Sequence, residues 1–402
     1  MTWKERVMLL ILACLNFTHI LDFMIMMPLG NYLMPHFGIS TRFFSLVVAA
    51  YPITAFVSGI VAAFFVDKFD RKKILLWAYI GFIVGTICCG IAPDPYFLIA
   101  ARIVTGLFGG LIGAQVLSII ADVFPYEKRG RAMGTIFTAF SIASVFGVPF
   151  SLYLANLISW HAPFIFIGLL GLLVIPLIYK FLPSMTTHMV PLGELRYKPD
   201  VRKVLRDMFN NKSQLMALSL SAFLMLGHFL IIPFINPYLE FNLGFSKSQT
   251  PMVYMIGGAC TLITSPLLGR MADRFGKLRI FMISLIASLV PIFLITNMPP
   301  IPFVYVLAVF GFWFVFSTGR NIPAQAMIST VVESSQRGQF MSFNSSFQQL
   351  FTGIASLISG MIVTEGTNGK IGNYDLVGYL SILIVGGSLY LGIRLAKKQS
   401  IS

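Results

Sequence analysis

Long apolar runs, each separated from the next by a short polar gap, follow one another along almost the whole chain. A helix needs about 20 apolar residues to cross the hydrocarbon core of a bilayer. These runs are too long and too continuous for the alternating strands of a membrane barrel, so they predict helices that satisfy their own backbone hydrogen bonds in lipid. We expect twelve such helices, at about residues 7–33, 42–66, 74–92, 95–121, 132–157, 162–182, 214–239, 249–269, 279–297, 301–326, 339–363 and 374–394.

One long polar segment, residues 183–213, separates six predicted helices from six others. Apolar residues recur within it at helical spacing, and Pro199 and Asp200 supply a helix start. We interpret the segment as a short amphipathic helix on the inner leaflet, with an ordinary solvated linker as the alternative. The expected organisation is an N-terminal bundle over 1–182, this cytoplasmic linker, and a C-terminal bundle over 214–402.

The two halves also repeat each other. Ser40 precedes the second run and Ser246 the eighth, and 27 residues after these serines stand Asp67 and Asp273, in the basic segments DKFDRKKI and DRFGKLRI. A second matched pair of segments, EKRGRAM and SQRGQFM, comes later in each half. Repeated landmarks of this kind indicate a duplicated six-helix unit, an arrangement in which two bundles move about a central site.

Composition and charge place the chain in a membrane. Hydrophobic residues make up 57% of the sequence and charged residues only 11%, whereas soluble domains carry roughly 25% charged residues. Most of the 29 Lys and Arg residues fall in every second gap, beginning with the N-terminus, which is the positive-inside pattern. The net charge of +14 therefore predicts cytoplasmic termini and contact with anionic lipid headgroups, and we expect no nucleic-acid partner.

Signatures of covalent chemistry are missing from the sequence. It contains no nucleotide-binding loop, no metal-ligand spacing and no nucleophile elbow. Its four cysteines all lie in apolar runs, at spacings that fit neither a zinc site nor a disulfide framework. We therefore expect neither an enzyme nor a cofactor.

The segment GRMADRFGKLR resembles the G-x-x-x-D-R-x-G-R-R signature of the major facilitator superfamily. This C-terminal copy keeps the glycines, the acid and the bases of the signature, at Gly269, Asp273, Arg274, Gly276 and Arg279. The N-terminal copy, AFFVDKFDRKK, keeps Asp67, Arg71 and Lys72 but has Ala63 and Asp70 where glycines are expected. The resemblance runs the length of the chain and implies an all-α fold of twelve transmembrane helices in two pseudo-symmetric six-helix bundles.

The resemblance also implies a latch. In this family the aspartate of the signature contacts the start of a helix in the opposite half and holds the cytoplasmic side shut. An acid beside a helix N-terminus gains about 0.3–1 kcal/mol from the helix dipole. We expect the helix starts that receive Asp67 and Asp273 near Gly338 and near Arg131, with a solvated charge cluster as the alternative.

Three further segments resemble the twelve-helix drug:proton antiporter group of the superfamily. ARIVTGLFGG is similar to the R-x-x-x-G motif of proton-coupled members, with Arg102 and Gly106. SIASVFGVPFSLYL is similar to the antiporter motif, with Gly147 and Pro149 at the expected kink but Val148 in place of its last glycine. LDFMIMMPL is similar to the acid-containing first helix of the group.

Full charges inside the runs are few: Asp22, Arg102 and Arg320, with Glu240 at the end of a run. A central Asp or Arg costs about 2.5–3.5 kcal/mol on the insertion scale, so these residues are functional candidates. We predict that Asp22, Arg102 and His19 couple transport to protons, because burial disfavours the ionised acid and a nearby cation favours it. The alternatives are a permanent Asp22–Arg102 ion pair and a His19 that is only hydrogen-bonded in the core.

The helices that line the centre of this fold carry aromatic, methionine and amide side chains, which suit varied apolar shapes. The candidate cavity residues are Asn16, Met26, Gln115, Phe137, Phe140, His228, Asn236, Tyr254, Trp313, Arg320, Asn321, Asn344 and Gln348. Three roles are open for Arg320: substrate binding, closure of an external gate, or a structural bond to backbone near Pro323.

Together these features predict a secondary active transporter of the bacterial inner membrane that exports amphipathic small molecules or drugs by alternating access. The proton gradient is its expected energy source, and a monomer its expected state. The alternatives are a proton-coupled symporter for a sugar or organic anion, and a lipid or lysolipid exporter. A sensor would be expected to carry a soluble domain and a membrane enzyme a catalytic cluster, and the sequence shows neither.

Overall fold

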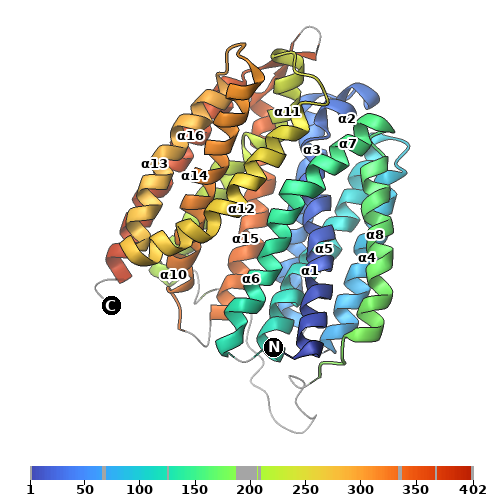
Figure 1. The fold of residues 1–402 in the computed structure, drawn as a ribbon, viewed down its shortest axis with the longest axis vertical. Helices are drawn as coiled ribbons and strands as arrows, with labels where there is room; N and C mark the ends of the chain where they lie inside the picture. Colours follow the sequence, from blue (N-terminus) through green and yellow to red (C-terminus); the bar gives the residue numbers. More distant parts are fainter. Residues whose placement is uncertain are drawn as a thin grey trace.

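Two groups of long helices lie side by side and run the length of the molecule (Figure 1). The computed structural model describes residues 2–65, 69–124, 126–186, 206, 210–333, 337–366 and 369–399. The first group holds α1 Trp3–Met26, α2 Gly30–Phe37, α3 Thr41–Phe65, α4 Arg71–Gly90, α5 Pro95–Val123, α6 Tyr126–Ile142, the π-helical turn η2 Ala143–Gly147, α7 Val148–Leu157 and α8 Ala162–Phe181. The second holds α10 Lys212–Phe229, η3 Ile232–Phe234, α11 Ile235–Pro237, η4 Tyr238–Asn242, α12 Thr250–Phe275, α13 Lys277–Thr296, α14 Phe303–Ser329, α15 Arg337–Ile362 and α16 Tyr374–Gln399.

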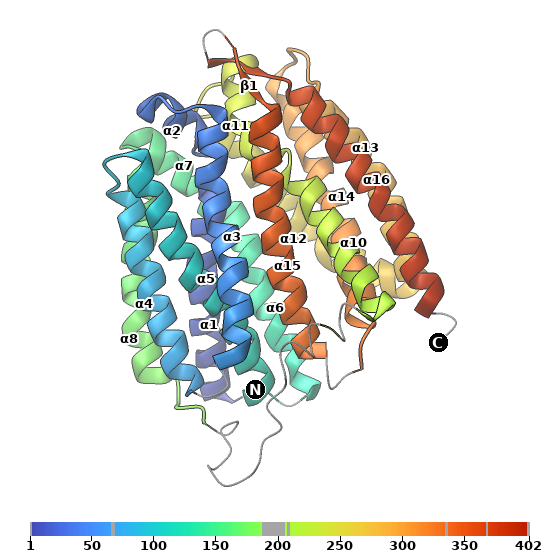
Figure 2. The same cartoon turned by 180° about the vertical axis from the view of Figure 1, so that it is seen from behind.

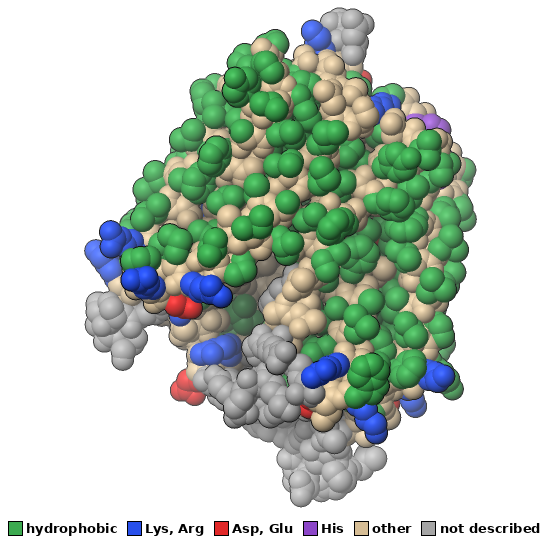
Figure 3. Space-filling model, in the orientation of Figure 1, with side chains coloured by type: hydrophobic (Ala, Val, Ile, Leu, Met, Phe, Trp, Pro, Cys, Tyr) green, Lys and Arg blue, Asp and Glu red, His purple; other side chains and the backbone are tan. Residues whose placement is uncertain are grey.

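The two ends of the molecule differ. We use the name hairpin end for the end that carries α2, α11 and the short antiparallel strands β1 Thr364–Glu365 and β2 Ile371–Gly372 (Figure 2). Both termini lie toward the other end, which we name the basic end because most of the Lys and Arg side chains visible in Figure 3 gather there. Between the two ends the visible surface is mostly hydrophobic, as a bilayer requires (Figure 3).

Composition and length alone identify eleven membrane spans among the described residues, and α15 is not one of them. This helix carries amides and hydroxyls along much of its length. It nevertheless runs beside α3 for most of its course (Figure 2) and also contacts α10. Because neighbouring helices cover α15, its polar groups are compatible with a place inside the bundle.

Prolines break two helices that the apolar runs predict to be continuous. The first run, 7–33, divides into α1 and α2 around Pro28, and the seventh, 214–239, changes at Phe229 into short 3-10, α and π turns that include Pro233 and Pro237. Proline lacks a backbone N–H and clashes with the preceding turn, so a regular helix cannot pass through it unchanged. Both breaks lie toward the hairpin end, one in each half.

Contacts between the two groups depend on small residues. A Cβ at Gly353 of α15 would lie 2.6 Å from the Ile53 side chain of α3, and one at Gly258 of α12 would lie 2.9 Å from Val145 of η2. Glycine at these positions allows the two pairs of helices to approach closely. The predicted amphipathic helix of the linker lies largely outside the described residues, since α8 ends at Phe181 and residues 187–205 and 207–209 are not described.

Candidate functional site

The first polar cluster is built on α1 and α5, whose starts are both fixed by side-chain caps. Thr2 and Glu5 form a capping box before α1, and Asp94 accepts hydrogen bonds from two backbone N–H groups at the start of α5. Within the bundle, Nη1 of Arg102 donates to Oδ2 of Asp22 at 2.7 Å, and both side chains are completely buried. The fold therefore brings together the acid and the base that the sequence singles out.

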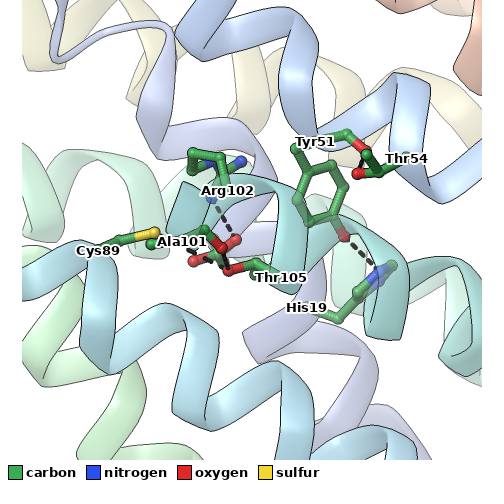
Figure 4. A network of polar contacts seen from close by, with 8 residues as sticks. His19, Tyr51, Thr54, Cys89, Ala101, Arg102 and Thr105 are labelled. Carbon is green, nitrogen blue, oxygen red and sulfur yellow. Dashed lines mark hydrogen bonds and ion pairs between the residues drawn. The ribbon is translucent and has the colours of Figure 1, made fainter. Parts of the chain in front are cut away.

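Tyr51 of α3 joins this pair to His19. The guanidinium of Arg102 lies 4.7 Å from the centre of the Tyr51 ring, and the Tyr51 hydroxyl lies 2.7 Å from Nε2 of His19 (Figure 4). A Cβ in place of the hydrogen of Gly109 on α5 would collide with that hydroxyl, so the close approach depends on glycine. The three predicted coupling residues thus lie in one network, with Tyr51 between His19 and the ion pair.

The ion pair leaves hydrogen-bonding capacity unused. Oδ1 of Asp22, Nε of Arg102 and Nδ1 of His19 are buried and have no hydrogen-bond partner among the residues described. A structural ion pair in a protein interior is stable only when its remaining donors and acceptors are satisfied. The structure therefore shows a close ion pair between Asp22 and Arg102 in which one further atom of each side chain is unpartnered among the described residues.

A second polar cluster lies in the other group, around Arg320 of α14. This completely buried guanidinium donates from Nη1 to Oγ of Ser288 on α13 at 2.8 Å, and its Nη2 lies 3.4 Å from Nδ1 of His228 on α10. The His228 ring stacks on Trp313, with ring centres 4.9 Å apart. Of the sequence-predicted cavity residues, the structure thus collects His228, Trp313 and Arg320 in one place.

Two further cavity candidates, Asn236 and Tyr254, lie at a contact between the groups near the hairpin end. Nδ2 of Asn236 donates to the carbonyl oxygen of Pro28 at 3.1 Å, and the Tyr254 hydroxyl donates to Oδ1 of Asn236 at 3.1 Å. Nearby, Thr41 of α3 donates to the carbonyl oxygen of Val363 at 3.1 Å. The bonds of Asn236 to Pro28 and of Thr41 to Val363 connect the two groups, while Tyr254 holds the Asn236 side chain from within the second group.

The remaining polar candidates are dispersed. Asn16 donates to the carbonyl oxygen of Ile136 at 3.3 Å, and the amide of Gln348 lies 3.4 Å from Oγ of Ser221. The other amide candidates either make a long contact, as Asn344 does to Gln325 at 3.5 Å, or have buried polar atoms that are unpartnered among the described residues, as in Gln115 and Asn321.

The apolar candidates separate in the same way. Met26 is buried at the end of α1 and Phe140 of α6 is 47% exposed, while the side chain of Phe137 lies outside the described residues.

The predicted kink of the fifth span lies at Gly147 and Pro149. The helix makes a π-helical turn, Ala143–Gly147, directly before Pro149. π-Turns interrupt helices at functional sites, and a Cβ at Gly147 would lie 2.8 Å from the side chain of Leu21, the neighbour of Asp22. The π-helical turn therefore packs closely against α1, next to Asp22.

The latch motif is only partly described. Asp67, the side chain of Arg131 and residues 334–336 lie outside the described part, and Asp273 and Arg274 are exposed on α12. One expectation is wrong. The helix expected to receive Asp273 is α6, and it begins at Tyr126 and not near Arg131, because it includes the basic segment as its first turns.

The remaining members of the motif form helix ends and attachments. Gly269 lies within α12, and Gly276 ends that helix with a φ of 97°, a conformation that favours glycine. In the N-terminal copy, Arg71 is the first residue of α4, and Nζ of Lys72 donates to the carbonyl oxygen of Tyr179 at 2.8 Å.

Asp70, which replaces a glycine of the motif, attaches the segment after α8 to the start of α4. Its carboxylate accepts hydrogen bonds from the backbone N–H groups of Lys72 and Met185, both at 2.9 Å, and from the Ser184 hydroxyl at 2.7 Å. Burial by itself raises the pKa of Asp70. The three hydrogen bonds together lower the pKa by more than burial raises it, so the pKa lies below its usual range. The sequence identified this residue only as a departure from the motif.

Comparison with known proteins agrees with this architecture. The family described as Major Facilitator Superfamily matches residues 12–234 and 217–398. An uncharacterised MFS-type transporter of Bacillus subtilis (strain 168), YbcL, is 26% identical over 318 residues, which cover 78% of this chain and 77% of the relative. A probable sugar efflux transporter of Helicobacter acinonychis is 24% identical over 305 residues, which cover 76% and 75% of the two chains.

Among solved structures, a D-xylose-proton symporter superposes with a TM-score of 0.76 and 18% identity, over 96% of each chain. The chain therefore belongs to the major facilitator superfamily, whose members are transporters and not enzymes. The predicted all-helical polytopic fold is confirmed.

Proposed function

We propose that this member of the major facilitator superfamily, a secondary active transporter, exports amphipathic small molecules in exchange for protons. The observation that supports the proposal is the buried Asp22–Arg102 pair, a titratable acid held by a single hydrogen bond to its counter-ion. Binding of a proton to Asp22 removes one of the two charges, which leaves the Arg102 guanidinium uncompensated. The proton thereby biases the equilibrium between two arrangements of the helices, provided that they bind it with different affinity.

The shape of the molecule supports alternating access. The hydrogen bonds of Asn236 and Thr41 join the groups near the hairpin end, while the surface between the groups is hollowed toward the basic end (Figure 3). The concentration of Lys and Arg there supports our proposal that the basic end faces the cytoplasm of a bacterial inner membrane. We interpret this arrangement as the state that is open to the cytoplasm.

The cargo we propose is amphipathic. The boundary between the groups brings aromatic rings together, as where Phe23 of α1 lies 5.9 Å from Phe229 of α10. Rings adapt to varied apolar bodies, and the few polar groups beside them orient a ligand. We expect a monomer to be the working unit, because a single chain contains both groups of helices and the boundary between them. We expect no cofactor, since the proton gradient would supply the energy.

The test of this proposal is the variant Asp22→Asn in proteoliposomes. We expect it to lose transport driven by a pH gradient while it keeps exchange of cargo down a concentration gradient. Asp375→Asn, which removes a carboxylate in the first turn of α16, is the matched control and keeps both activities. Undiminished proton-driven transport by Asp22→Asn would exclude Asp22 as the proton carrier.

Import of an organic anion with protons is the second candidate function. It is favoured by the buried cation of Arg320, which has no carboxylate beside it among the described residues. The direction of transport separates the two candidates: an exporter fills inside-out vesicles whose lumen is acidic, whereas a symporter fills right-side-out vesicles in acidic medium.

A further inference from the structure

The C-terminal half contains a buried cation whose partners are neutral. Arg320 is completely buried; among the residues that the structure describes it bonds only to the Ser288 hydroxyl and the His228 ring, and its Nε has no partner there. No carboxylate lies within ion-pair distance of it in the described part of the chain. A buried ion is costly unless an opposite charge lies beside it, so the Arg320 cluster has room for a negative charge that a ligand could supply.

The N-terminal half shows the same design with its anion present. Asp22 and His228 are separated by the same number of residues as Asp67 and Asp273, and they lie on the corresponding helices α1 and α10. Asp22 contacts an arginine of α5, and His228 contacts an arginine of α14. A neutral imidazole cannot supply the charge that the carboxylate supplies in the first half.

The Arg320 cluster has N–H donors without partners among the described residues, and aromatic rings lie between it and the boundary of the two groups. Nε of Arg320 and Nε1 of Trp313 are both buried without a partner among the residues described. His228, which stacks on Trp313, remains partly exposed, and its neighbour Phe229 meets Phe23 across the boundary between the groups. A ligand that entered along this boundary would meet rings first and the cation behind them.

We propose that Arg320, with Ser288, His228 and Trp313, binds the carboxylate of an amphipathic organic anion whose apolar body lies against the rings at the boundary. The guanidinium offers a planar fork that matches the two oxygens of a carboxylate. One cation with neutral neighbours balances one negative charge, which favours a monocarboxylate over a phosphate dianion. This inference rests on the transport function proposed above and specifies the charge of its cargo.

The experiment compares charged and uncharged probes of the same shape on the purified full-length protein in nanodiscs. The probes are 2-naphthoate with 2-naphthamide, and decanoate with decanamide, and calorimetry measures their equilibrium affinities. We expect at least one carboxylate to bind about tenfold to a hundredfold more tightly than its amide, the range of hydrogen bonds to a charged group. The absence of this preference in every pair overturns the inference, whatever the variants do.

Three variants assign the preference to its residues. Arg320→Gln removes it, and Arg320→Lys retains part of it because the charge stays while the fork is lost. The control is Ser388→Ala, which removes a buried hydroxyl bonded within α16 and keeps the preference, because it leaves the proposed site intact. A preference that survives in folded Arg320→Gln overturns the inference.

Asp22→Asn separates this inference from the proposed function. We expect this variant to keep the preference at equilibrium, since its side chain belongs to the other cluster. If Asp22→Asn transports normally while Arg320→Gln loses the preference, the proton-coupling proposal fails and the anion site stands.

Discussion

The hydroxyl of Tyr51 and Nε2 of His19 lie 2.7 Å apart, and the Tyr51 ring also lies against the guanidinium of Arg102. One side chain of α3 therefore contacts both the histidine and the ion pair of the neighbouring helices. Tyr51→Phe tests what this contact does, because it removes the hydroxyl and keeps the ring.

If His19 exchanges protons through Tyr51, Tyr51→Phe slows proton-driven transport by about a hundredfold or more, the lower end of what a positioned proton donor contributes. Exchange without a pH gradient stays unchanged. If the bond is only structural, the variant loses about 1 kcal/mol of stability and no coupling. Transport assays with and without a gradient, beside thermal unfolding, distinguish these results.

The Asp22–Arg102 ion pair leads to a prediction about the stability of the folded protein. Arg102→Gln leaves buried Asp22 without its cation, a loss that costs about 3–5 kcal/mol when the charge remains. Asp22→Asn/Arg102→Gln removes both charges, so we expect the double variant to be more stable than Arg102→Gln alone. Thermal unfolding of the four members of this cycle measures the interaction. Simple addition of the two single losses would show that the residues do not interact.

The closure near the hairpin end depends on Asn236. Asn236→Ala removes its bond to the Pro28 carbonyl, which weakens the closed arrangement by about 0.5–1.5 kcal/mol, or two- to tenfold in population. Spin labels at exposed Arg42 and Ser248, in a variant without native cysteines, are expected to show a larger share of long distances.

The matched control for this experiment is Asn242→Ala. Asn242 also bonds to backbone, at Ile371, but both residues belong to the C-terminal half. We expect the distances between the labels at Arg42 and Ser248 to stay unchanged in it. An equal shift in both variants would mean that Asn236 does not hold the two groups together.

Asp70 gives the chain a pH-dependent attachment. Because its pKa is lowered in the folded state, its stabilisation is complete above the ordinary carboxyl range, about pH 4, and is lost as the pH falls through the folded-state value. Asp70→Asn is expected to lower the unfolding temperature at pH 7 but to match the wild type in strong acid. A difference that stays constant with pH would exclude a role of the ionised carboxylate.

The sequence predicts those parts of the structure that involve residue types rarely found in membrane spans. Asp22 and Arg102 are conspicuous because charges in apolar runs are costly, and their pairing follows from the same cost. Tyr51 is not conspicuous, since a tyrosine in a span is common, and its contacts depend on how α3 and α5 pack.

The contacts that long side chains make also cannot be predicted from the sequence. Arg320 can point along several directions from α14, so its approach to His228 and Ser288 emerges only from the assembled helices. The π-turn at Ala143–Gly147 shows the same limit: glycine and proline indicate a kink, but not the extra residue in the turn.

The polar character of α15 has a consequence for how the chain is made. A helix that composition alone does not identify as a span gains little on leaving the translocon for lipid by itself. Its main neighbour, α3, is synthesised long before it, so α3 is already in the membrane when α15 emerges. We therefore expect α15 to insert against α3, on a surface that the first half of the chain provides.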